Sequence, residues 1–197
     1  MKAEGSHSTD AAREALIRQL RVYGASWPEE AGLVRRFTGF LAAHPDCFDR
    51  RLATGHVTGS AWLVNRTGTH VLLTHHRKLG IWVQLGGHAA GDGNVFRVAL
   101  REAEEESGLT GLVPAGLDLF DIDAHRIPPR SGVPEHIHWD LRYAFRAMGG
   151  EDYRVGAESH DLAWVEIGRL EELTREESML RMARKWLGRG RNGQPVG

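Results

Sequence analysis

The sequence predicts an α+β fold, or a mixed α/β sandwich, in which a helical extension precedes one domain built on a mixed sheet. Apolar residues recur at helical spacing near the start of the chain, whereas alternating and continuous apolar runs typical of strands dominate its middle. One strongly helical segment interrupts those runs, and another follows them. This order of elements favours helices on the faces of a mixed sheet over a doubly wound parallel sheet.

The first predicted helix covers residues 10–24. Asp10 can cap its start and Gly24 can end it. The residues that give the helix its apolar stripe are Leu16, Ile17 and Leu20. The preceding residues, 1–9, are polar, and we expect them to be disordered.

A second predicted helix covers residues 26–45. Ser26 and Glu29 have the spacing of a capping box, and Pro45 closes the segment. We therefore expect residues 10–50 to form an N-terminal helical extension.

Strand-like runs begin after this extension and belong to a domain that we place at residues 56–188. The runs cover residues 55–65, 69–76, 79–89, 118–127, 135–147 and 161–167. A closing helix is predicted at 175–187, and residues 189–197 are expected to form a loose tail.

The composition is that of a soluble globular protein, with 41% hydrophobic residues and a formal net charge of −1. A charge so close to zero gives no general field that would draw the protein to DNA or to a membrane. The single cysteine, Cys47, excludes an internal disulfide and a zinc site built from cysteines. The polar N-terminus and the lack of an apolar run of roughly 20 residues lead us to expect a cytoplasmic protein.

Residues 94–107 are predicted to form a helix whose acidic residues gather on one side. At about 100° per residue, Glu102, Glu105 and Glu106 share an arc beside the apolar face, while Glu104 points toward solvent. The apolar face consists of Val95, Phe96, Ala99, Leu100 and Ala103. A run of Glu can simply be a solvated face. Carboxylates at the rim of a buried face are costly, however, and Mg²⁺, which prefers oxygen ligands, would remove that cost.

The loop that precedes this helix is rich in glycine, at positions 86, 87, 91 and 93. Such a loop turns sharply and brings backbone groups close to a ligand, and the helix start that follows it favours anions. Arg101 lies one turn before Glu105 and can orient its carboxylate. Loop, helix and carboxylates together indicate a cation that holds a phosphate-rich substrate.

Residues 87–109 resemble the signature of the Nudix hydrolases, Gly-x5-Glu-x7-Arg-Glu-(aliphatic)-x-Glu-Glu-x-Gly-(aliphatic). The positions that match are Gly87, Arg101, Glu102, Ala103, Glu105, Glu106, Gly108 and Leu109. The chain departs from the signature at the internal Glu, where Gly93 stands and the nearest carboxylate, Asp92, comes one residue early. Either Asp92 takes that role after a slip in the loop, or the role is vacant.

The resemblance implies a Nudix α/β/α sandwich that hydrolyses a diphosphate linked to another group, with Mg²⁺ or Mn²⁺. It implies that Glu102, Glu105 and Glu106 are metal ligands, joined by the carbonyl of Gly87, and that Arg101 holds the Glu side chains in place. Metal ions suit this chemistry because they neutralise phosphate charge and lower the pKa of bound water. Glu105, Glu106 and Arg101 are accordingly the catalytic candidates on the helix.

A further catalytic carboxylate is sought outside the helix, among Glu135, Glu151 and Glu158. We favour Glu158, because it lies in a polar, glycine-led stretch shortly before a strand that carries Trp164. This placement is similar to that of an additional catalytic Glu in some Nudix enzymes. The alternative is an exposed loop Glu.

Basic and imidazole side chains provide the candidates for substrate binding. Arg77 and Lys78 can meet phosphates, and His88 and His138 can line a polar pocket. His136 and His138 lie two apart on a predicted strand and face one side, so with His88 they could instead form a transition-metal site.

Two aromatic residues of the predicted strands also bear on substrate binding. Trp82 and Trp139 can stack on a base, although core packing is the expectation for both.

Three functions therefore compete: a Nudix-type pyrophosphohydrolase, a non-catalytic Nudix-fold module that binds a nucleotide or an RNA end, and a histidine-metal enzyme. The expected partner is a small diphosphate, nucleotide-derived in the leading hypothesis. A homodimer is left open. The sequence does not choose between nucleoside triphosphates, ADP-ribose, dinucleoside polyphosphates, coenzymes and non-nucleotide diphosphates, because substrate pockets are formed by loops outside the motif.

Overall fold

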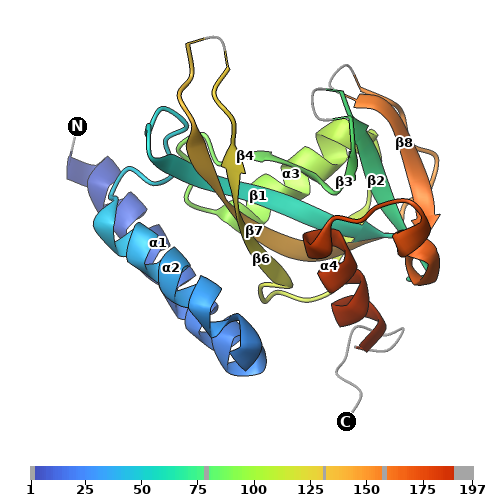
Figure 1. Cartoon of the computed structure of the whole chain (residues 1–197), viewed down its shortest axis with the longest axis horizontal. Helices are drawn as coiled ribbons and strands as arrows, with labels where there is room; N and C mark the ends of the chain where they lie inside the picture. The colour runs from blue at the N-terminus through green and yellow to red at the C-terminus, as the bar shows by residue number, and fades with distance from the viewer. Residues whose placement is uncertain (1–2, 78–79, 131, 157–158, 189–197) are drawn as a thin grey trace.

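The computed structural model describes residues 3–77, 80–130, 132–156 and 159–188 (Figure 1). Its helices are α1 (Ala3–Ser26), η1 (Pro28–Glu30), α2 (Ala31–Ala43), α3 (Val95–Ser107), η2 (Ile167–Glu172) and α4 (Glu177–Gly188). Its strands are β1 (Gly55–Val64), β2 (His70–His76), β3 (Trp82–Val83), β4 (Leu85–His88), β5 (Leu112–Pro114), β6 (Asp121–Ile127), β7 (His136–Ala147) and β8 (Ser159–Glu166). The predicted order of helices and strands is confirmed, with β5 as the strand that the sequence did not reveal.

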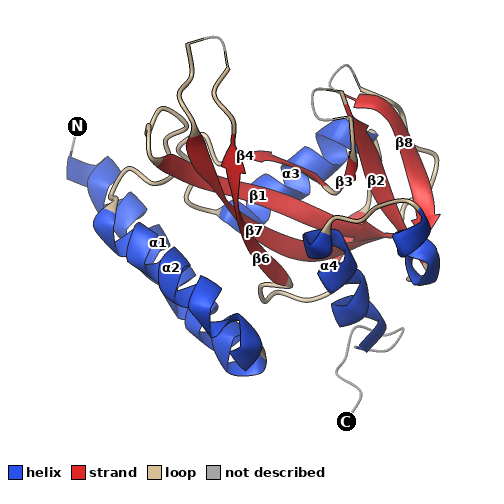
Figure 2. Ribbon diagram, in the orientation of Figure 1, coloured by secondary structure: helices blue, strands red, loops and turns tan. Residues whose placement is uncertain are grey.

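Strand β1 is the centre of the sheet (Figure 2). It runs parallel to β7 along its whole length and antiparallel to β4 and β2. Strand β2 continues the sheet to β3 and β8, and β7 continues it to β5 and β6. The sheet is therefore mixed, as expected, and β4, β1 and β7 bring three distant parts of the chain side by side.

The two faces of the sheet are covered by different helices (Figure 1). Alternate residues of β1, such as Leu63, belong to the main apolar core together with Ala99 of α3. Gly59 lets α3 approach closely, because a Cβ at this position would lie 2.9 Å from Cγ1 of Val95. On the opposite face Trp62 packs in a second core with residues of α4.

Helix α1 begins at Ala3, so the expected disorder is wrong for residues 3–9. The buried residues Leu16 and Leu20 anchor the helix against the core. Because helix formation is cooperative, polar residues ahead of an anchored segment can continue it at little cost. The rest of the predicted disordered start and the predicted tail, 189–197, lie outside the described residues.

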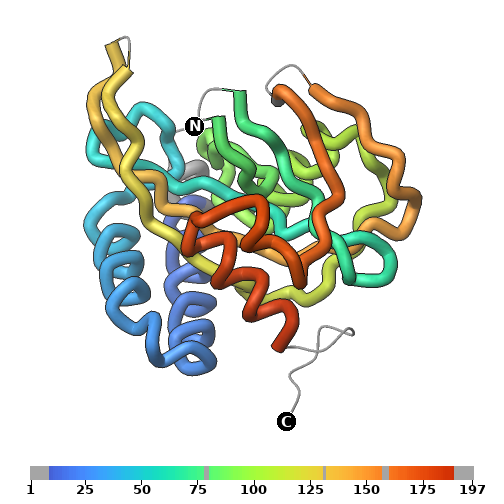
Figure 3. The backbone as a smooth tube through the Cα atoms, turned by 45° about the vertical axis from the view of Figure 1, so that its right-hand side comes forward, coloured from blue at the N-terminus to red at the C-terminus, as the bar shows by residue number. Residues whose placement is uncertain are grey.

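The junction between α1 and α2 also differs from the sequence prediction. Gly24 does not end α1; it makes room for Val34 of α2, whose Cγ2 would lie 3.3 Å from a Cβ at position 24. The expected capping box is absent, because the Ser26 hydroxyl donates to the Val22 carbonyl, and Trp27, the residue before η1, provides no side-chain cap. Figure 3 shows the resulting helical hairpin beside the sheet.

The N-terminal helices share the apolar core of the domain. Phe37 and Phe40 of α2 contact Trp139 of β7, and the ring centroids of Phe40 and Trp139 are 4.6 Å apart in a stacked arrangement. Leu20 of α1 lies in the same core. The helical extension is therefore part of the folded unit, and Trp139 has the core role that the sequence favoured.

A buried network of polar and charged groups fastens α1, through Tyr23, and α4, through Lys185, to the sheet. Lys185 Nζ lies 2.6 Å from Oδ1 of Asp121 and 2.5 Å from Oε1 of Glu30. Arg142 and Arg181 meet the other oxygen of Asp121 at 3.0 and 2.8 Å. Burial alone would raise the pKa of the Asp121 carboxyl, but the Arg181 hydrogen bond and the charges of Arg142 and Lys185 hold this pKa below its ordinary value.

Within the described ranges, no helix is both long and apolar enough to cross a membrane.

Candidate active site

Helix α3 is fixed at both ends by local capping. The Asn94 side chain accepts a hydrogen bond from the Arg97 N–H at 3.1 Å, which satisfies one of the free donors at the helix start. Gly108 adopts a left-handed conformation at φ 68° and ends the helix, with its N–H donating to the Glu104 carbonyl. The predicted helix is confirmed, with its first helical residue at Val95.

Glu102 faces the sheet at Gly87, on the neighbouring strand β4. A Cβ at position 87 would overlap the carboxylate of Glu102, so this close approach requires glycine. Arg101 Nη2 lies 2.7 Å from Glu102 Oε1. The Glu102 side chain is 20% exposed, so it is mostly but not fully buried.

Glu106 lies one turn further along α3 and contacts the adjacent glycine. Its Oε1 accepts a hydrogen bond from the Gly86 N–H at 3.0 Å. Glu105 is 65% exposed, so the expectation that it is partly buried is wrong, and Arg101 Nε lies 3.9 Å from its carboxylate. Glu104 points to solvent, as predicted.

These residues fit a hard divalent cation. Glu102 and Glu106 approach successive glycines of one strand from successive turns of one helix, and Glu105 stands at the exposed rim. Arg101 is a cation that contacts this group, through Glu102 and Glu105. An all-oxygen set of carboxylates is the ligand set that Mg²⁺ and Mn²⁺ prefer.

Asp92 does not turn toward these carboxylates. It accepts hydrogen bonds from Arg97 Nη2 at 2.7 Å and from the Asn94 N–H at 2.9 Å, at the first turn of α3. Gly93 is covered by α1, because a Cβ at this position would clash with Cβ of Ala12. The space that a side chain at this position of the signature would need is therefore filled by α1.

The contact between Gly93 and Ala12 borders a cleft of about 660 Å³ between α1 and the start of α3. Ala12 and Gln19 line it on one side, and Asn94 and Arg97 line it on the other. The cleft ends against Tyr143, whose hydroxyl donates to Gln19 Oε1 at 3.0 Å.

His88 and His138, expected to line a substrate pocket, belong to a larger group of imidazoles. Their ring centroids lie 5.1 Å apart, and both lie about 5 Å from the ring of His56. His136 and His125 complete the group. Sequence reasoning missed His56, which pairs with His138 across the parallel strands β1 and β7.

Burial keeps two of these imidazoles neutral. Desolvation and the neighbouring histidines lower the pKa of His56 to about 4, while the Leu52 backbone opposes this shift without reaching hydrogen-bonding geometry. The same causes lower the pKa of His138 to about 2. Both rings can therefore act as acceptors or ligands at neutral pH.

The remaining candidates are dispersed. Arg77 lies in the turn after β2, and Lys78 and Glu158 lie outside the described residues. Glu135 pairs with Arg126 at 3.0 Å. Glu151 accepts a hydrogen bond from the backbone of the β1–β2 turn.

Trp82, the second aromatic candidate, stacks on His75 with ring centroids 5.1 Å apart. It also packs against the core beneath α4.

No protein-family model and no curated protein matches the chain. Several solved structures, however, match the chain in fold. An Ap4A hydrolase from C. elegans matches with a TM-score of 0.51 at 16% identity, covering 67% of this chain and 96% of that one. A Nudix hydrolase from M. smegmatis matches with a TM-score of 0.50 at 18% identity, covering 66% of this chain and 83% of that one.

A third similar structure, the E. coli dihydroneopterin triphosphate pyrophosphohydrolase, has a TM-score of 0.50 at 14% identity and covers 66% of this chain and 92% of its own. Likeness at this level of identity defines the fold. The chain has the Nudix fold, and the expected mixed sandwich is confirmed.

Proposed function

We propose that this protein is a Nudix-type hydrolase that cleaves a pyrophosphate bond in a nucleotide-derived substrate, with Mg²⁺ or Mn²⁺ held by Glu102, Glu105 and Glu106. The observation that carries the proposal is the approach of Glu102 and Glu106 to Gly87 and Gly86. On the Nudix fold this arrangement gathers carboxylates one turn apart, which repel one another, so a bound cation would relieve their repulsion.

The residues of the chain have separable roles in this proposal. Glu102 and Glu106 provide inward-facing oxygens, and the backbone carbonyl of Gly87 can add another. Arg101 would fix the orientation of the Glu102 carboxylate through a hydrogen bond of 2.7 Å. When bound, the divalent ion neutralises phosphate oxygens and lowers the pKa of a water molecule.

Glu158 is proposed as the general base that activates the attacking water. The loop that leads to it packs on the end of α3: the Arg154 N–H donates to the Ser107 carbonyl at 2.7 Å. A Cβ at Gly156, two residues before Glu158, would lie 3.7 Å from the Glu106 carbonyl oxygen. The two other candidates are engaged elsewhere, Glu135 with Arg126 and Glu151 with the backbone of Arg66.

The residues proposed to bind the substrate are two cations and two histidines. Arg77 and Lys78 would meet phosphate oxygens, and His88 and His138 would contact the remainder of the substrate. His88 directly follows Gly87 on β4 but faces the opposite side of the strand, so a substrate that contacts both the carboxylates and His88 must extend past β4.

The test is a hydrolysis screen with Mg²⁺ and with Mn²⁺, using nucleoside triphosphates, ADP-ribose, dinucleoside polyphosphates, coenzymes and non-nucleotide diphosphates, with the products identified. We expect Glu106→Gln to lower turnover of the active class by at least about 100-fold. Glu104→Gln is the matched control on the exposed side of the same helix and should keep full turnover. Failure of every class, or full turnover by Glu106→Gln, would overturn the proposal.

The second candidate function is a binding module that has lost hydrolysis. The observation that favours it is Gly93, which carries no carboxylate and is covered by Ala12. Such a module would bind a nucleotide or an RNA end in equilibrium titrations and would release it unchanged in the same screen.

A further inference from the structure

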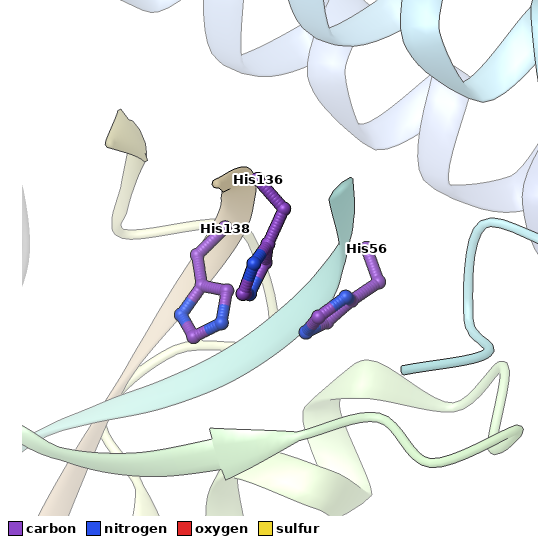
Figure 4. A group of neighbouring side chains, drawn as sticks. All are labelled: His56, His136 and His138. Carbon is purple, nitrogen blue, oxygen red and sulfur yellow. The ribbon is translucent and has the colours of Figure 1, made fainter. Parts of the chain in front are cut away.

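Three histidines from two parallel strands meet on one face of the sheet (Figure 4). His56 lies at the start of β1, and His136 and His138 lie at the start of β7. Each offers a ring nitrogen, and the three nitrogens all lie within 4.8 Å of one another. The parallel register produces this meeting, because it sets His56 directly beside His138.

Three buried ring nitrogens of this cluster lack hydrogen-bond partners among the described residues. Both ring nitrogens of His56 and Nε2 of His138 are buried without a hydrogen bond. His56 is only 3% exposed. Leaving a buried polar group unpaired costs about 1–3 kcal/mol, so a compact set of such groups needs an explanation.

His136 is oriented as a metal ligand would be. Its Nδ1 lies 2.9 Å from the Pro134 carbonyl oxygen, which can only accept a hydrogen bond. In the neutral ring this contact puts the proton on Nδ1 and a lone pair on Nε2, the atom that a metal ion would use. A backbone carbonyl that fixes the tautomer in this way is the usual outer-shell partner of a ligating histidine.

The cluster is separate from the carboxylates of α3. Gly87 pairs with Gly59, and both of these glycines face α3. His88 and Thr58, one residue along in each strand, face the opposite side of the sheet, as does His56. The three-histidine cluster and the Glu residues thus lie on opposite faces of the strands that carry them.

We propose that His56, His136 and His138 bind a divalent transition-metal ion of the Zn²⁺ class, in a second metal site beyond the one in the proposed function. Imidazole nitrogens select such ions over Mg²⁺. Three histidines fill three of the four positions of a tetrahedral site and leave one open. His88, whose ring lies 5.0 Å from that of His56, borders this open position.

The spacing is compatible with such an ion after small ring movements. Bonds of about 2.0–2.1 Å in a tetrahedron separate neighbouring nitrogens by about 3.3 Å. The nitrogens here, within 4.8 Å of one another, therefore close by about 1.5 Å at most. The bound ion would join the first residues of β1 and β7.

The experiment uses untagged, full-length protein stripped with a chelator and held in excess Mg²⁺, so that the carboxylates of α3 are already occupied. Co²⁺ serves as the probe, because tetrahedral nitrogen coordination gives it an intense visible spectrum. We expect one Co²⁺ per chain, displaced by Zn²⁺. His138→Gln should weaken binding by more than the roughly 10–100-fold that loss of an outer-shell partner costs.

Two variants separate this site from other sources of binding. His70→Gln, on β2 and outside the cluster, should bind Co²⁺ as the wild type does. Glu106→Gln should also retain the Co²⁺ spectrum, whatever its effect on hydrolysis, so failure of the proposed function leaves this result independent. Co²⁺ binding that is lost in Glu106→Gln and kept in His138→Gln would overturn the proposal.

A measurement on the wild type alone covers the case in which His138→Gln fails to fold. Crystals soaked in Zn²⁺ should show anomalous density at the zinc edge among the three rings. Crystals without such density would overturn the proposal, and so would a wild-type protein that binds no Co²⁺ in solution.

Discussion

The carboxylate of Glu102 occupies the space beside Gly87 that a side chain at this position would need. Because the overlapping atoms are the end of a flexible side chain, Gly87→Ala should displace this carboxylate without unfolding the protein. A displacement of about 1 Å can cost about 100-fold in rate, so we expect a loss of that order in metal-dependent turnover. Thermal unfolding should stay close to that of the wild type.

Gly116→Ala is the control for this substitution, because a Cβ at Gly116 meets no atom within 4 Å. It should leave both turnover and stability unchanged. A Gly87→Ala variant with normal turnover would show that the position of Glu102 does not matter to the reaction.

Restoring the signature Glu should harm the protein. Gly93→Glu would force a side chain against Ala12 of α1, and overpacking of this kind costs about 1–3 kcal/mol. We expect a lower free energy of unfolding in denaturant titrations and no gain in turnover. Gly39→Glu, on the exposed side of α2 where a Cβ meets nothing, should show no such loss. A stable, faster Gly93→Glu variant would contradict the role assigned to α1.

Asp121 is the centre of the buried charge network. Asp121→Asn would leave Lys185, Arg142 and Arg181 without their shared carboxylate, and breaking one partner of a buried ion pair costs about 3–5 kcal/mol. Equilibrium unfolding should show this loss. Glu172→Gln, which breaks the exposed ion pair between Arg169 and Glu172, should change the free energy of unfolding little. Equal stability of the two variants would mean that the network does not fasten α1 and α4.

The same network predicts an acid transition. Burial raises the pKa of Asp123, but His125, Arg142 and Arg181 outweigh burial and set this pKa to about 2, below the ordinary 3.8. Asp121 shifts in the same direction, and the other groups that face it are Tyr23, Glu30 and Lys185. Below pH 3.8 the unfolded chain binds more protons at these carboxyls than the folded protein does, so protonation favours unfolding.

We therefore expect the free energy of unfolding to fall as the pH drops from about 4 to about 2. Asp121→Asn should flatten this dependence. Unfolding titrations at several pH values check both, and an identical pH slope in wild type and variant would contradict the assignment.

The sequence predicted what depends on local spacing and missed what depends on contacts between distant segments. Helix α3 and its arc of Glu residues follow from a periodicity within 14 positions, 94–107, and this helix is present as expected. Apart from the short strand β5, the strands of the sheet were predicted for the same reason. Their pairing was not, and only the parallel register of β1 and β7 brings His56 to His138.

The role of the N-terminal helices also could not be predicted from local sequence patterns. The motif showed that Gly93 lacks the signature carboxylate, but no local feature relates it to Ala12, which covers it in the fold. Likewise, helical spacing placed Glu105 with Glu102 and Glu106, whereas in the fold its side chain is 65% exposed.

The most direct test of the proposed metal site is the anomalous density of Mn²⁺ in crystals of the wild-type protein soaked with Mn²⁺. The account predicts a peak among Glu102, Glu105 and Glu106, close to Gly87. The same soak of Glu106→Gln crystals should weaken or remove that peak, and Glu104→Gln crystals should keep it. Mn²⁺ density only at the histidines of β1 and β7, with none beside α3, would contradict the account.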